Sequence, residues 1–108
     1  MNTPVSFEIV KLLEKISWKF PYTIEYLEEL QGTNNYIESI PTIAEVVMWL
    51  YENHGVWIAC VAWEENPRFL SKVFVVNDIA KSRNIGSFNS PTEAYTAAIE
   101  YTLTKLIK

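Results

Sequence analysis

Apolar residues recur at helical spacing after residue 41 and predict an amphipathic helix there. The stripe consists of Ile43, Val46, Val47 and Leu50, at positions i, i+3, i+4 and i+7. Thr42 and Glu45 fit a capping box, in which each side chain accepts a hydrogen bond from the other residue's backbone N–H. Gly55 follows the last turn and can take the left-handed conformation that ends a helix. We therefore expect a helix from residue 42 to residue 54.

A second helix is expected from residue 90 to Ile107, where Ala, Tyr, Ile and Leu again recur at helical spacing. Ser90 is the expected cap, and Pro91 suits the first helical position, where its missing N–H costs nothing. Glu93 would complete a capping box with Ser90.

The segment between these helices reads as strands. Residues 56–63 are short, almost uniformly apolar and rich in Val, Ile and Trp, which favour a pleated surface. Residues 64–67 predict a turn, 69–76 a second strand, 77–83 a polar connection and 84–88 a short third strand. The expected fold class is α+β: an α-β-β-β-α unit whose three-stranded antiparallel sheet carries its helices on one face.

The N-terminal part is expected to add one or two helices. Pro4 fits the first position of a helix, and Phe20-Pro21 would end it. Its expected buried stripe is Ile9, Leu12, Leu13 and Ile16. Residues 22–40 leave open a short helix closed by Gly32, and Asn34-Asn35 is interpreted as a turn. We expect a single domain over 1–108, with 1–40 as a helical extension and 41–108 as the α-β-β-β-α core.

Composition narrows the possible functions. Nine Lys and Arg against 13 Asp and Glu give a net charge of −4, so there is no general attraction to nucleic acid or anionic membranes. The only cysteine is Cys60, which rules out an internal disulfide, and no apolar run reaches membrane-spanning length. The start of the chain lacks a signal-peptide pattern, and we expect a cytoplasmic protein.

Three segments carry a resemblance to other proteins. Residues 5–13, 41–58 (PTIAEVVMWLYENHGVWI) and 87–103 (SFNSPTEAYTAAIEYTL) resemble small uncharacterised proteins encoded by Bacteroides-type gut bacteria and their phages or prophages. The resemblance implies a phage-linked origin and no residue roles. The helix–three strands–helix order also resembles the double-stranded-RNA-binding topology, but a shared topology does not transfer a function. A basic start to the last helix would be needed to grip phosphates, whereas this one starts Ser-Pro-Thr-Glu.

Residues suited to catalysis or metal binding are sparse. His54 is the only histidine and lies at a predicted helix C-terminus, where the helix dipole favours a partly charged imidazole. Cys60 has no basic neighbour in sequence to lower its pKa. The adjacent pairs Glu28-Glu29 and Glu64-Glu65 are interpreted as solvated charge, and three glycines cannot build a phosphate-binding loop. We expect a non-enzymatic protein without catalytic residues, metal or cofactor.

The predicted hairpin sorts its side chains onto two faces. With a four-residue loop at 64–67, Trp63 would stand opposite Arg68, and Trp57 opposite Phe74. The face with two cations is the better candidate for the side without helices. The candidate interaction or ligand residues on this face are Trp57, Trp63, Arg68, Leu70, Lys72 and Phe74.

So large an apolar area predicts a cover, and three covers remain open. The N-terminal helix could fold back over the sheet. Another protein, most simply an identical copy in a dimer or else a host protein, could pack against it. A nucleotide or single-stranded nucleic acid could stack on the tryptophans, with Arg68 and Lys72 meeting phosphates. The sequence thus predicts a binding or interaction protein, with nucleotide binding and single-stranded nucleic-acid binding as the alternatives.

Overall fold

The computed structural model describes residues 3–16, 18–63 and 68–107, and at Trp63 the description is confined to the backbone. The predicted turn at 64–67 lies outside these residues. The fold is α+β, as predicted, and helices pack on a three-stranded antiparallel sheet. Along the chain the elements are α1 (Phe7–Lys15), α2 (Ile24–Leu30), α3 (Asn34–Ser39), α4 (Ile43–His54), β1 (Val56–Trp63), β2 (Arg68–Val75), the 3₁₀ turn η1 (Ile79–Lys81), β3 (Arg83–Phe88), α5 (Pro91–Tyr101) and the π-helical turn η2 (Thr102–Leu106).

Helix α4 has the start and end that its sequence predicts. The Glu45 N–H donates to Thr42 Oγ1 at 3.2 Å, and the Thr42 N–H donates to Glu45 Oε1 at 3.1 Å, so the capping box is closed. Gly55 has a φ of 64°, in the left-handed region that favours glycine. The predicted stripe is buried: Ile43, Val46, Val47 and Leu50.

Helix α5 departs from its prediction at both ends. The Glu93 N–H donates to Ser90 Oγ, but Glu93 Oε2 accepts from the N–H of Asn89, so the predicted box with Ser90 is not closed. The α-helix ends at Tyr101, and Thr102–Leu106 continue as a π-helical turn in which the Ile107 N–H donates to Thr102 O at 3.0 Å. Helical periodicity predicts that the helix continues to Ile107, but it does not predict the wider turn. The hydrogen bonds of a π-helix span five residues and those of an α-helix span four, a difference too small to change the apolar pattern.

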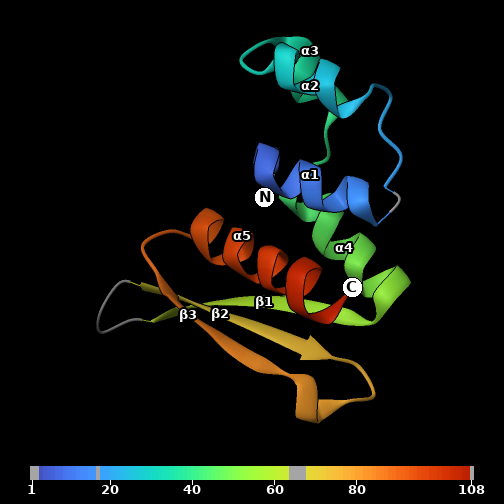
Figure 1. Ribbon diagram of the computed structural model, residues 1–108. Helices are drawn as coiled ribbons and strands as arrows, with labels where there is room; N and C mark the ends of the chain where they lie inside the picture. Colours follow the sequence, from blue (N-terminus) through green and yellow to red (C-terminus); the bar gives the residue numbers. More distant parts are fainter. Residues whose placement is uncertain (1–2, 17, 64–67, 108) are drawn as a thin grey trace.

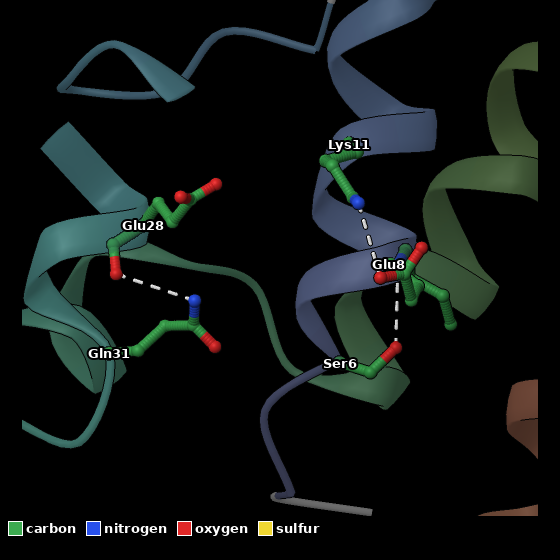
Figure 2. Close-up of polar contacts among 6 residues, drawn as sticks. Ser6, Glu8, Lys11, Glu28 and Gln31 are labelled. Carbon is green, nitrogen blue, oxygen red and sulfur yellow. Dashed lines mark hydrogen bonds and ion pairs between the residues drawn. The ribbon is translucent and has the colours of Figure 1, made fainter. Parts of the chain in front are cut away.

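The prediction that Pro4 opens the first helix is wrong. Pro4 forms an antiparallel bridge with Thr42, and the Val5 N–H donates to Pro41 O at 3.1 Å. Helix α1 begins after this bridge, where Ser6 Oγ accepts from the N–H of Ile9 at 3.3 Å. Figure 2 shows this cap together with the Glu8–Lys11 ion pair of 3.1 Å one turn later. Pairing with residues 41–43 provides hydrogen-bond partners for the backbone of residues 3–5, so the helix begins at the next residue able to cap it, Ser6.

The open question of residues 22–40 resolves into two short helices. Helix α2 is present, and the Gln31 side chain folds back to donate to Glu28 O at 3.3 Å in its last turn (Figure 2). The interpretation of Asn34-Asn35 as a turn is wrong, because both residues open α3. Thr33 caps α3 by accepting from the N–H of Tyr36 at 3.2 Å, a cap signal that outweighs the turn preference of asparagine.

Strands β1 and β2 pair in the predicted register. Trp57 lies opposite Phe74, and Trp63 opposite Arg68, so the hairpin alternation is confirmed. In the second pairing the register shifts between Ser71 and Lys72 on β2. The shift leaves Ile85 of β3 without a partner, as in a β-bulge.

All the helices that approach the sheet lie on one side of it (Figure 1). The core lies between the sheet and helices α4 and α5, and α1 packs on α5 and η2 from beyond them, while α2 and α3 lie furthest from the sheet. The suggestion that the N-terminal helix covers the opposite face is therefore wrong. Ile9 and Leu13 of α1 belong to the same buried cluster as Val46 of α4, so the apolar side of this helix is buried in that core.

Candidate interaction face

The outer face of the β1–β2 hairpin is the side of the sheet turned away from the helices. Its described members are Trp57, Ala59 and Val61 of β1 and Arg68, Leu70, Lys72 and Phe74 of β2. The backbone of Trp63 pairs with that of Arg68, and its side chain lies outside the description. Trp57, Val61 and Phe74 are 39%, 47% and 44% exposed, whereas Val73, next to Phe74 in the strand, is fully buried. The predicted assignment of the two faces is confirmed.

The outer face has an aromatic end where the hairpin leaves α4. Trp57 and Phe74 are direct cross-strand partners. Trp57 also contacts Tyr51 of α4, and the two ring centroids are 5.5 Å apart at an interplanar angle of 82°. This edge-to-face packing holds the indole in one orientation while leaving it partly exposed. Sequence reasoning missed Tyr51, since the chain reverses at Gly55 and no periodicity relates the two rings.

The two cations of the outer face differ in their hydrogen bonding. Arg68 donates from Nε to Ser87 Oγ at 2.6 Å and from a terminal nitrogen to Ser87 O at 2.8 Å, which fixes the guanidinium against β3. An arginine has five N–H donors, so Arg68 keeps some of them available. Lys72 is half-buried, and no hydrogen bond or ion pair of its side chain occurs within the described residues. Ser87 was missed as well, because it pairs through β3 and not through the predicted hairpin.

The inner face carries one buried polar contact. Ser71 is 1% exposed, and its Oγ donates to Ala94 O in the first turn of α5 at 2.7 Å. A hydroxyl inside an apolar layer is tolerated because it is hydrogen-bonded. The contact joins the middle of β2 to α5 and keeps the inner face facing the helices.

His54 and Cys60, two residues considered for catalysis, lie on different elements, α4 and β1. His54 is the exposed last residue of α4, with its ring centroid 4.9 Å from that of Trp49. Cys60 is half-buried on the inner side of β1, and burial raises the pKa of its thiol. The pKa of Tyr95 is raised by burial and, to a smaller degree, by the charge on Cys60. Within 3–16, 18–63 and 68–107, no three His, Cys, Asp or Glu side chains are grouped to hold a metal ion.

The structure also has surface hollows on its helical side. A cavity of about 530 Å³ lies along α1 and α5, and its lining includes Lys11, Lys15 and Glu100 but no residue of the outer face. The outer face thus offers an open surface of rings and aliphatic side chains. Such a surface suits contact with another macromolecule or a flat ligand better than enclosure of a small substrate.

Comparison with known proteins gives no further guide. No family model, curated protein or solved structure matches the chain. Across the part of the chain that the structure describes, every helix is too short or too polar to cross a bilayer.

Proposed function

We propose that this protein is a non-enzymatic binding module that acts through the outer face, on a second copy of itself or on a host protein. The observation that carries the proposal is the one-sided exposure of Trp57, Val61 and Phe74 on a sheet whose other side holds the helices. Large apolar side chains gathered on one open face mark interaction sites in proteins.

The composition of the outer face supports a protein partner. Tryptophan and arginine are the residues most enriched among interface residues that dominate affinity. Trp57 is held by Tyr51, and Arg68 by Ser87, so binding would order few additional side chains. A face prepared in this way gains affinity mainly by avoiding the loss of side-chain freedom.

The phage or prophage origin implied by the resemblance is part of this proposal, and it makes a bacterial host protein the natural foreign partner. The cytoplasmic location expected from the sequence stays a prediction beside it.

Nucleotide binding is the second candidate function. The exposed Trp57 ring lies on the same face as Lys72, which has no polar partner within the described residues, so a base could stack on the indole with a phosphate near the ammonium. Single-stranded nucleic acid would use the same two groups. Against both stands the engagement of Arg68 with Ser87. Titration of tryptophan fluorescence with mono-, di- and cyclic nucleotides and with an oligonucleotide tests this candidate, and no quenching at about millimolar ligand removes it.

A photo-crosslinking experiment tests the main proposal. The photoreactive amino acid p-benzoylphenylalanine is introduced at Phe74, and the matched control carries it at Ile79, which is 88% exposed but lies outside the hairpin. In the bacterial cytoplasm, position 74 should give a discrete covalent adduct, with itself or with one host protein, and position 79 should not. Phe74→Ser, which removes the ring, should abolish the adduct of a reporter placed at Trp57. Equal labelling from positions 74 and 79, or none from either, contradicts the proposal.

A further inference from the structure

Helices α2 and α3 form an acidic lobe at the end of the molecule opposite the sheet (Figure 1). We call residues 22–39 the α2–α3 lobe. All of its glutamates are exposed: Glu25, Glu28, Glu29 and Glu38. The chain has no lysine or arginine between residues 20 and 67, and within the described residues none of these carboxylates forms an ion pair. The lobe therefore presents a negatively charged surface to solvent.

Two of these glutamates lie on the outer side of α2. Leu27 is fully buried in the core, and Glu25 and Glu29 stand two positions before and after it, which places them on the opposite side of the helix. Lys15 borders the same surface hollow as Glu25, but no ion pair joins the two side chains. Like charges four residues apart destabilise a helix, so a cation supplied from outside the lobe would stabilise α2.

The lobe also exposes large side chains beside this charge. Tyr22, Tyr26 and Ile37 are 46%, 46% and 54% exposed. The two tyrosine rings pack edge to face with their centroids 5.0 Å apart, so they form one aromatic surface. Exposed rings next to charged groups are typical of surfaces that contact another protein.

The outer face has the opposite charge. Its described members include Arg68 and Lys72 and no carboxylate. Lys72 lies on the central strand, directly across from Ala59 on β1 and Asn84 on β3, so its cross-strand partners are uncharged. Two copies that met outer face to outer face would bring like charges together and remove both lysines from water, which is unfavourable. A surface that bears carboxylates avoids this cost.

We propose that the α2–α3 lobe of one copy packs on the outer face of the next copy, with the Glu25 and Glu29 carboxylates meeting Lys72. The two surfaces are opposite in charge, and each has exposed rings beside its charged groups, Tyr26 on the lobe and Trp57 on the outer face. They lie at opposite ends of the molecule, so two copies cannot satisfy both surfaces of each other (Figure 1). The contact is therefore heterologous and adds copies head to tail.

This inference rests on the proposed function and deepens it by naming the partner, the surface that the partner contributes and the form of the assembly. Every copy inside such an assembly has its outer face covered. Only the copy at one end keeps the outer face open to a host protein.

Two charge-reversed variants test the contact by light scattering. The mass of the parent protein should rise with concentration beyond two chains and fall when salt is raised from about 50 to 500 mM. Lys72→Glu alters only the outer face, and the double variant Glu25→Lys/Glu29→Lys alters only the lobe. Each variant alone should associate at least about tenfold more weakly than the parent. Mixed together, they should form a complex of two chains and no larger one, because one intact lobe meets one intact outer face.

The control is Lys105→Glu, which makes the same change in charge on an exposed residue of η2, and it should assemble like the parent. Circular dichroism checks that every variant is folded. A parent protein that stays a single chain up to about 1 mM, or whose mass stops at two chains, overturns the inference. So does a mixture of the two variants that stays monomeric. The crosslink from position 74 to a host protein is independent of these results and remains the separate test of the proposed function.

The position of the contact can be mapped on the purified parent protein. With p-benzoylphenylalanine at Phe74, mass spectrometry should locate the adducts between copies within residues 22–39 of the neighbouring copy. Adducts within residues 57–74 of the neighbour would show that the outer faces meet each other, and this result overturns the head-to-tail contact.

Discussion

Neighbouring residues of β2 provide the sharpest test of how the sheet is oriented. Val73 is fully buried against the helices, and Phe74 is 44% exposed on the outer face. We compare Val73→Ala with Phe74→Ala. The valine substitution removes far fewer carbon atoms, so side-chain size alone predicts that the phenylalanine substitution costs more stability. The structure predicts the reverse order.

The expected magnitudes follow from burial. Val73→Ala loses two buried methyl-sized groups, about 1.6 kcal/mol of transfer free energy, and leaves a cavity whose cost adds about 1 kcal/mol. We expect a total of about 2–3 kcal/mol. Phe74→Ala loses about half of a transfer free energy of roughly 1.5–3 kcal/mol, plus a cross-strand contact with Trp57 of about 0.2–1 kcal/mol. No cavity forms because water fills the site, so the expected total is about 1–2.5 kcal/mol, centred below that of Val73→Ala.

Urea denaturation followed by circular dichroism measures both. At dilute concentrations, where association contributes nothing to stability, the midpoint should fall by roughly 1–2 M for Val73→Ala and by a smaller amount for Phe74→Ala. The slope of the transition should stay the same in both. A larger loss for Phe74→Ala than for Val73→Ala would mean that the aromatic side of the hairpin is the core, and the interaction face would no longer exist.

Three further predictions concern single groups. Gly55→Ala should cost about 1–2 kcal/mol of unfolding free energy because φ is 64° at this position; the added Cβ would make only an ordinary 3.8 Å contact with Val76, so the cost comes from the backbone. Gly55→Asn should cost less, because asparagine tolerates this conformation better than alanine. Equal losses for the two variants in urea melts would refute the backbone explanation. Ser71→Ala should cost about 1 kcal/mol by thermal melting, since a buried hydrogen bond is lost, and a neutral result would show that this bond contributes nothing. Burial raises the pKa of the Cys60 thiol above its ordinary 9.0, so the stability that this group contributes is present below that value and declines as pH rises through the folded-state pKa. Cys60→Ala should therefore make the urea midpoint depend less on pH between about pH 8 and 10. The same pH dependence in the variant and the parent protein would contradict this.

Much of the fold follows from signals that are local in the chain. The helix at α4 is specified by Thr42 and Glu45 at its start and by Gly55 at its end, all within one turn of the boundary they set. The sorting of the hairpin into two faces follows from the two-residue repeat of a strand and from the pairing of Trp63 with Arg68, four residues further along the chain than Trp63's neighbour, so the pairing of Trp57 with Phe74 could be predicted. In each case a residue and its structural consequence are a few positions apart, or are related by a fixed period.

The features decided by tertiary structure join residues that no period relates. Pro4 belongs to a bridge with Thr42 rather than to a helix, and Tyr51 holds Trp57 across a chain reversal. Arg68 is engaged by Ser87, 19 residues away, although its sequence neighbourhood suggested a cation available for phosphate. The apolar stripe of α1 predicts that one side of the helix is buried, but it does not specify which apolar surface that side packs against. Only the packed molecule determined that α1 joins the core behind α5 and leaves the outer face of the sheet uncovered, because burial free energy depends on the total apolar area removed from water and not on position in the chain.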